Sequence, residues 1–136
     1  MLALTIKQPW LYAILNCGKD IENRNWKPSN QLLGQQIVLH SSKMFDEKFH
    51  KNCEKNKDVC ICGAILGVAT IKEVVQESKS KWFTGKYGLV LVNVMALKEP
   101  IYCKGKLGFW QVEKEIEEKI KKELSGCSLS KTSHFQ

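Results

Sequence analysis

Short runs in which apolar residues alternate with polar ones, or follow one another without a break, recur over the first 112 residues. Such runs are typical of β-strands that are buried on one face or on both. They predict about six strands, at 2–8, 20–26, 36–42, 61–75, 89–97 and 109–112. Gly63 and Gly67 fall inside the longest run, and glycine within a strand indicates a bulge or bend, as where a sheet curls toward a barrel.

Two segments between these runs have the apolar spacing of helices. In 9–18, Pro9 suits the first turn and Gly18 the end, and one face carries Trp10, Ala13, Ile14 and Cys17. Residues 43–56 have a partial apolar stripe, which predicts a surface helix. We therefore expect an α+β fold: a small curled sheet or barrel of about six strands with two or three flanking helices.

The chain after residue 112 predicts one more helix and a tail. From Val112 into the segment 113–126, apolar residues recur at every fourth position among charges, as Val112, Ile116, Ile120 and Leu124. We expect this helix to pack on the body, with partner binding as the alternative. Residues 127–136 show no period and predict a flexible tail. No linker interrupts 1–112, so this range is expected to form one domain.

The net charge of +7 is unevenly distributed along the chain. Residues 1–110 hold 16 Lys and Arg against 9 Asp and Glu, whereas residues 111–136 hold 5 of each kind. The whole excess lies on the expected domain. It favours a polyanionic partner such as nucleic acid or a nucleotide, although lysine-rich surfaces also serve solubility.

The six cysteines predict neither disulfides nor a metal site. The first residues lack the basic and apolar regions of a signal peptide, and no stretch is long enough to span a membrane. We therefore expect a cytoplasmic protein with free thiols, with a nuclear location open for a eukaryotic source. Cys53, Cys60 and Cys62 lack the paired spacing of zinc ligands. We expect a monomer without metal or cofactor.

The run 20–26 combines a strand with charge. Alternation places Asp20, Glu22, Arg24 and Trp26 on one face. This pattern favours a strand that lines a polar pocket; the alternative is an edge strand with a Glu22–Arg24 ion pair. Arg24 is the only arginine of the chain, and its planar fork matches a carboxylate or a phosphate better than lysine does. Lys19, directly before the strand, can reach the mouth of such a pocket, where burial near another cation would lower its pKa.

Six blocks of the sequence, in order, resemble the ASCH (activating signal cointegrator homology) domain of the PUA-like superfamily of small β-barrels. They are LTIKQPW, KDIENRNW, IVLHSSK, GAILGVATI, KWFTGKYGLVL and CKGKLGFW. The family pattern G-x-K-x-x-E-x-R is matched at Lys19, Glu22 and Arg24, with Cys17 where the glycine is expected. The resemblance covers about residues 2–112 and implies a small stand-alone ASCH protein with a PUA-like fold.

The resemblance also implies functions. ASCH domains are expected to bind RNA or nucleobases in a cleft near the motif. One branch hydrolyses N4-acetylcytidine with a lysine, a threonine and a glutamate; here Lys19 matches the lysine and Glu22 occupies the threonine position. In an enzyme of this kind Lys19 and Glu22 would be catalytic, with Glu22 as general base and Lys19 polarising a carbonyl. Other members resemble ribonucleases, and a regulatory protein-interaction module is a further alternative.

The expected ligand site is therefore a cleft around the motif strand. Its predicted ligand-binding residues are Lys19, Glu22, Arg24, Trp26, His40, Trp82 and Tyr87. The lysines that could follow a phosphate backbone are Lys79, Lys81, Lys86, Lys104 and Lys106. Trp10 is also able to stack on a base, but Trp10 and Trp110 are favoured as core residues, and a structural role is favoured for His40.

Overall fold

The computed structural model of the chain describes residues 1–46 and 60–134. Its elements, in chain order, are β1 (Leu2–Gln8), α1 (Trp10–Asn16), β2 (Ile21–Arg24), the 3-10 helix η1 (Asn30–Leu32), β3 (Gln36–Phe45), β4 (Ala64–Val75), β5 (Tyr87–Tyr102), β6 (Phe109–Gln111) and α3 (Lys114–His134). Neither α-helix in these ranges combines the length and the hydropathy that a membrane span requires.

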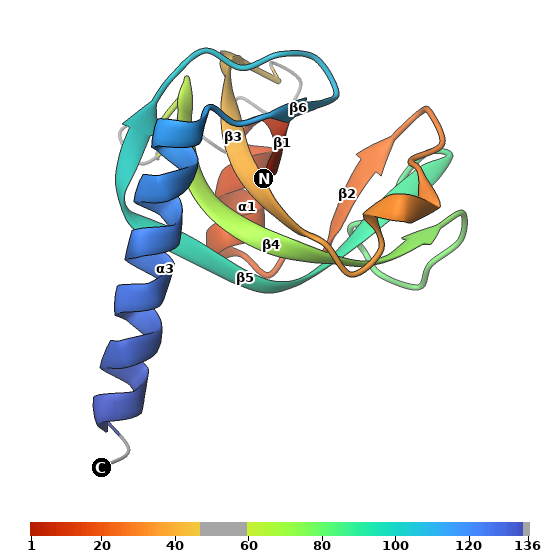
Figure 1. Cartoon of the computed structure of the whole chain (residues 1–136). Helices are drawn as coiled ribbons and strands as arrows, with labels where there is room; N and C mark the ends of the chain where they lie inside the picture. Colours follow the sequence, from red (N-terminus) through yellow and green to blue (C-terminus); the bar gives the residue numbers. More distant parts are fainter. Residues whose placement is uncertain (47–59, 135–136) are drawn as a thin grey trace.

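The six strands form one strongly curved sheet (Figure 1). Their order is β2-β5-β4-β3-β1-β6; β1 and β3 are parallel, and the other neighbours are antiparallel. The expected α+β fold with a curled sheet of about six strands is confirmed. A closed barrel is wrong, because in the described part of the chain β2 and β6 are the two edges of the sheet and do not pair with each other.

Alternation along the strands gives the sheet two apolar faces. On one face, α1 packs against side chains that include Leu4, Leu39 and Ile71. On the other, the first turns of α3 cover a second cluster that includes Val38, Val68 and Ile120. The sheet therefore lies between the two helices, and α3 continues beyond it (Figure 1).

The end of α1 delivers the chain to the motif strand. Gly18 has φ +73°, a left-handed conformation that glycine adopts without a Cβ clash. The N–H of Lys19 then donates to the carbonyl of Ala13 at 3.1 Å. The predicted apolar face of the helix is partly wrong: Leu11, Ala13 and Ile14 are buried, whereas Cys17 is exposed.

Several element boundaries differ from the predicted ones, and three elements extend well beyond them. β3 continues to Phe45, which pairs with Gln8, so residues 43–45 are strand rather than helix; the rest of the predicted 43–56 helix, from residue 47, lies outside the described residues. β5 continues through 98–102, predicted as loop, because Ile101 and Tyr102 pair with β4. The predicted helix end at residue 126 falls inside α3. The division into domain, packed helix and flexible tail stays a prediction.

Candidate functional site

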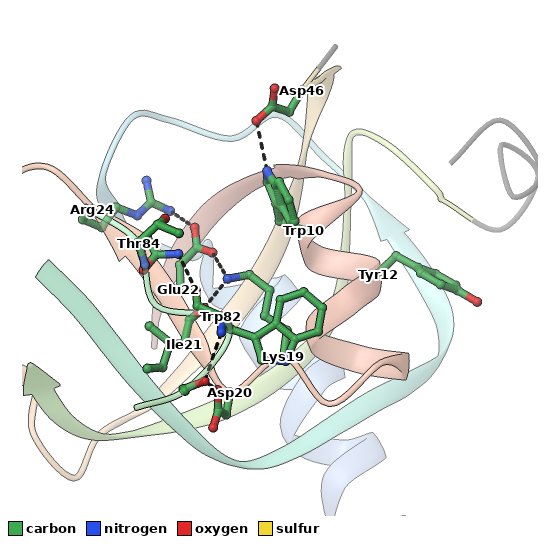
Figure 2. A network of polar contacts seen from close by, with 12 residues as sticks. Trp10, Tyr12, Lys19, Asp20, Ile21, Glu22, Arg24, Asp46, Trp82 and Thr84 are labelled. Atoms are coloured by element: carbon green, nitrogen blue, oxygen red, sulfur yellow. Dashed lines mark hydrogen bonds and ion pairs between the residues drawn. The ribbon is translucent and has the colours of Figure 1, made fainter. Parts of the chain in front are cut away.

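The motif strand β2 is an edge strand, yet its charged side chains are buried. Lys19 and Glu22 are 3% and 6% exposed, and Arg24 is half-buried. Glu22 forms ion pairs with both cations: its Oε1 lies 3.7 Å from Lys19 Nζ, and its Oε2 accepts a hydrogen bond from Arg24 Nη2 at 3.0 Å. We call these three residues the charge cluster (Figure 2). Both sequence-based interpretations hold, because the strand is an edge with a Glu22–Arg24 ion pair and also lines a pocket.

Backbone carbonyls complete the coordination of the two cations. Lys19 Nζ donates to the carbonyl of Ile21, and Arg24 Nη2 donates to the carbonyl of Thr5 at 3.2 Å. Arg24 Nε is buried without a hydrogen-bond partner in the described part of the chain. The N–H donors of Lys19 and Arg24 therefore outnumber the acceptor atoms of Glu22: two of their bonds go to backbone carbonyls, and Arg24 Nε stays unused.

Burial controls the ionisation of the cluster. Desolvation lowers the pKa of Lys19, and the attraction of Glu22 opposes that shift. Desolvation likewise raises the pKa of Glu22, and the attraction of Arg24 and Lys19 opposes it. With all three groups ionised, two cations face one carboxylate, so the cluster carries one excess positive charge. That excess favours a ligand that presents electron-rich oxygen or nitrogen atoms.

Lys19 and Glu22 of the cluster form the floor of a pocket of about 410 Å³, which we call the Lys19 pocket. Two tryptophan rings flank the ammonium group: Lys19 Nζ lies 5.7 Å from the ring centroid of Trp10 and 5.9 Å from that of Trp82. Both contacts are within cation–π range. Trp10 Nε1 donates to Asp46 Oδ2 at 3.0 Å, which fixes the orientation of that ring (Figure 2). The pocket therefore has aromatic walls and a charged floor.

The loop that carries Trp82 is fastened to β2. Asn23 Nδ2 donates to the carbonyl of Trp82 at 2.8 Å, and Asn23 Oδ1 accepts from the N–H of Thr84 at 2.9 Å. Ser80 Oγ donates to Asp20 Oδ1 at 2.7 Å. One wall of the Lys19 pocket is thus positioned by side chains of the strand that supplies its floor.

Comparison of the sequence with protein-family models finds no match, and comparison with curated proteins finds none. The structure, however, is similar to crystal structures of ASCH from Zymomonas mobilis. A mutant form of that protein matches with a TM-score of 0.58 and 13% identity, over 89% of this chain and 94% of that one. The form without a named mutation matches with a TM-score of 0.53 and 14% identity, over 89% and 93%. The chain has the fold of an ASCH domain. The resemblance seen in the sequence is confirmed at the level of the fold, and the function of this ASCH-fold chain is argued from its own site.

A second pocket of the ASCH-fold chain adjoins the first, and a third adjoins the second. The Arg24 pocket, of about 330 Å³, is lined by residues that include Lys7, Arg24 and Lys106. The Lys104 pocket, of about 460 Å³, is lined by residues that include Lys43 and Lys104. The Arg24 pocket shares Trp10, Glu22, Asn23 and Asp46 with the Lys19 pocket, and it shares Thr5, Ser42, Lys106 and Leu107 with the Lys104 pocket.

His40 lies in the Lys104 pocket and supports its structure. Its Nε2 lies 2.8 Å from the carbonyl of Cys103; a carbonyl only accepts, so Nε2 carries the proton. Nδ1 then accepts from Thr5 Oγ1 at 3.2 Å, and Thr5 Oγ1 accepts from Trp110 Nε1 at 2.9 Å. Burial lowers the pKa of His40, which keeps the ring neutral. Both ring nitrogens are used, which agrees with the structural role favoured from the sequence.

The ASCH fold brings together only part of the predicted site. Lys19, Glu22, Lys81 and Trp82 line the Lys19 pocket, Arg24 lines the adjoining one, and Lys104 and Lys106 line the third. Trp26 packs edge-on against Phe109, with ring centroids 6.1 Å apart. The predicted site residues that line none of these three pockets are Trp26, Tyr87, Lys79 and Lys86.

Several pocket residues were missed by the sequence-based reasoning. Trp10, favoured as core, is half-buried and lines two pockets. Asn23 was assigned to the face opposite Glu22, and Asp46 to a surface helix, yet both line the Lys19 pocket. Ser42 and Lys43 line the Lys104 pocket. The sequence signal for the last two is their position directly after the buried strand segment 37–41.

No metal centre emerges from the described ranges, in which no three His, Cys, Asp or Glu residues lie close enough together to hold an ion. Cys60 is buried and Cys62 is half-buried, and Cys53 lies outside the described residues. Burial raises the pKa of Cys103, so its thiol stays protonated.

Proposed function

We propose that the Lys19 pocket binds a nucleobase, either within RNA or in a nucleotide. A base offers a flat apolar face and an edge with both donors and acceptors. The two tryptophan walls suit the face, because bases stack on aromatic rings. Lys19 can donate to a carbonyl or ring nitrogen, and Glu22 can accept from an amino group. The observation that carries the proposal is that Trp10, Trp82, Lys19 and Glu22 line one pocket of about 410 Å³.

The pocket is also suited to one base by size and by construction. Its volume falls within the range of about 300–1,000 Å³ that is usual for ligand pockets. Its walls are held in place without ligand by the Trp10–Asp46 bond and by the Asn23 bonds to the 76–86 loop. A pocket that is already formed loses little conformational entropy when a ligand enters, so weakly binding mononucleotides are useful probes.

Calorimetric titration with the four ribonucleoside 5′-monophosphates tests the proposal. We expect at least one to bind, and Trp82→Ala to weaken it about 5- to 150-fold, because stacking contributes about 1–3 kcal/mol per base. The matched control is Tyr102→Ala, which removes a 70% exposed aromatic ring that lines none of the three pockets. Equal dissociation constants for wild type and Trp82→Ala would show that the base does not bind in this pocket.

A second candidate function is hydrolysis of an acylated nucleobase in the same pocket. It is favoured by one observation: Lys19, whose pKa is lowered by burial, lies 3.7 Å from the Glu22 carboxylate on the pocket floor. Lys19 would donate to the amide carbonyl oxygen, and Glu22 would take a proton from the attacking water. The C–N bond then breaks, and the amine leaves with that proton while the acyl group leaves as a carboxylic acid.

Incubation with N4-acetylcytidine, followed by mass spectrometry, tests this second candidate. Hydrolysis would yield cytidine and acetate with wild-type protein and not with Lys19→Ala. Lys119→Ala, which removes an exposed lysine of α3, is the matched control and should retain the activity. Unchanged N4-acetylcytidine with wild-type protein would reject this substrate and leave base binding as the function of the pocket.

A further inference from the structure

The three pockets form one continuous cleft. The Arg24 pocket lies between the other two, because it shares four lining residues with each of them. One end of the cleft is the Lys19 pocket with its tryptophan walls. The other end is the Lys104 pocket, formed by the end of β3 and the 103–107 loop that follows β5. A ligand that fills the Lys19 pocket can therefore continue along the surface into the Lys104 pocket.

Charge rises along this cleft. The Lys19 pocket is lined by two lysines and two carboxylates, and its net charge is zero. The Arg24 pocket is lined by three cations (Lys7, Arg24 and Lys106) against two carboxylates. The Lys104 pocket is lined by Lys43, Lys104 and Lys106, and among the described residues around it there is no carboxylate. A neutral end and an end with a charge of +3 match an uncharged base and the anionic phosphate of an adjoining nucleotide, because the Arg24 pocket separates the two ends.

We propose that the Lys104 pocket binds a phosphate group of single-stranded RNA whose neighbouring base occupies the Lys19 pocket. The ligand of the cleft is then a strand of at least two nucleotides and not a free nucleoside. This inference rests on the proposed base-binding function. The three lysines and the Ser42 hydroxyl supply donors for phosphate oxygens, and the exposed side chains of Met44 and Leu107 give the adjoining sugar or base an apolar surface.

The Lys104 pocket is built by a close approach that only glycine permits. A Cβ at Gly105 would lie 2.5 Å from Thr5 Oγ1 and 2.6 Å from the His40 ring. The loop backbone therefore rests directly on the His40–Thr5 pair, and the His40 bond to the Cys103 carbonyl holds it there. Lys104 and Lys106, on either side of Gly105, are in this way fixed at the pocket instead of moving with a free loop.

Two probes separate this inference from the proposed function: a fluorescein-labelled eight-nucleotide single-stranded RNA of mixed sequence, and the tightest-binding ribonucleoside monophosphate. The variant is Lys104→Ala/Lys106→Ala. The matched control is Lys119→Ala/Lys122→Ala, which removes two exposed lysines from α3, away from the three pockets. Anisotropy between 50 and 200 mM salt measures the RNA, and calorimetry measures the mononucleotide.

We expect the first double variant to bind RNA with a salt slope smaller by about 1.4, because each lost phosphate contact on a single strand removes about 0.7. Over this fourfold salt range, wild-type affinity then falls about 7-fold more than that of the variant. Mononucleotide affinity should change less than the RNA affinity, and the control should match wild type with both probes.

Three results would overturn the inference. Equal losses in the two double variants would show that only overall charge matters. Equal affinity of wild type for RNA and mononucleotide would confine the ligand to the Lys19 pocket, and base binding would stand. If wild type bound neither probe, the proposed function would fail together with this inference.

Discussion

Removal of the Glu22 charge is the sharpest perturbation of the site. Glu22→Gln keeps the size of the side chain but leaves Lys19 and Arg24 facing a neutral amide. Lys19 is 3% exposed, so it cannot turn to water for compensation. Breaking a buried ion pair by removal of one partner costs about 3–5 kcal/mol of stability. We expect a loss of that size in the free energy of unfolding at pH 7.

In Glu22→Gln, Lys19 can escape the cost of an unpaired buried charge by losing its proton, so the cost of deprotonation is the most that this charge can contribute to the loss. Deprotonating a lysine of ordinary pKa 10.5 at pH 7 costs about 4.8 kcal/mol, at about 1.36 kcal/mol per pH unit. At pH 9 the same cost is about 2.0 kcal/mol. Burial lowers the pKa of Lys19 in the folded state, so the unfolded chain binds the proton more tightly and stability rises with pH up to the unfolded pKa. The defect of Glu22→Gln should therefore shrink between pH 7 and pH 9.

Urea unfolding of wild type and Glu22→Gln, followed by circular dichroism at both pH values, measures the effect. The matched control is Glu99→Gln, at an exposed position of β5, which should stay within about 0.5 kcal/mol of wild type. Lys19→Met/Glu22→Gln should recover stability relative to Glu22→Gln, because it also removes the buried ammonium group. A loss below about 1 kcal/mol at pH 7, or the same loss at pH 9, would refute the account of the cluster.

Three further changes follow from individual contacts. Arg24→Lys keeps the charge but removes the terminal guanidinium nitrogen that bonds both Glu22 and Thr5. Urea unfolding should show a loss of about 1.5–3 kcal/mol, the usual value of a hydrogen bond to a charged group, and an unchanged midpoint would contradict this. Burial lowers the pKa of His40, so below pH 6.5 the free energy of unfolding should fall by at most about 1.4 kcal/mol per pH unit as this ring is protonated. In His40→Gln, the contribution of this ring to the pH dependence of stability should be absent. Gly67→Ala places a Cβ 2.5 Å from the carbonyl oxygen of Met95, and the melting temperature should fall as expected for overpacking of about 1–3 kcal/mol; a melting temperature equal to wild type would contradict the close contact.

The buried strands could be predicted because their pattern is local. Segments 36–42 and 61–75 carry apolar residues at the strand period, and they are found in β3 and β4. The extensions of β3 and β5 could not be predicted, because pairing with distant partners decides them. Phe45 is extended by its pairing with Gln8, and Tyr102 by its pairing with Ala64, although the sequence around Pro100 is typical of a loop. Closure of the sheet into a barrel likewise depends on pairing between the edge strands β2 and β6, which are far apart in the sequence.

The floor of the site could be predicted from the sequence, but of its two walls only Trp82 was expected at the ligand. Glu22 and Arg24 are two residues apart, a spacing that strand geometry converts into one face, and Lys19 comes just before that strand. The walls come from distant segments: Trp82 is held by bonds between its loop and Asn23, and Trp10 by its bond to Asp46. A strand pattern assigns Asn23 to the opposite face, and only the loop that lies against it brings it into the pocket. Such contacts are tertiary and leave no periodic signal.

The buried charge cluster also explains why arginine stands at position 24 of a chain that otherwise uses lysine. One terminal nitrogen of Arg24 bonds both the Glu22 carboxylate and the Thr5 carbonyl, and thereby links β2 to β1. A guanidinium group tolerates this half-buried position because it remains charged under all ordinary conditions. An ammonium group at position 24 would have a pKa that burial could lower, and its charge would then depend on pH.

The indole N–H signals of the four tryptophans report directly on whether a base binds between Trp10 and Trp82. In ¹⁵N-labelled protein, each signal is assigned by a Trp→Phe variant and followed while the eight-nucleotide RNA is added. The Trp10 and Trp82 signals should move with a common dissociation constant, while that of Trp26, which lines none of the three pockets, should move less than either. Unmoved Trp10 and Trp82 signals at RNA concentrations that saturate binding would contradict base binding between the two rings.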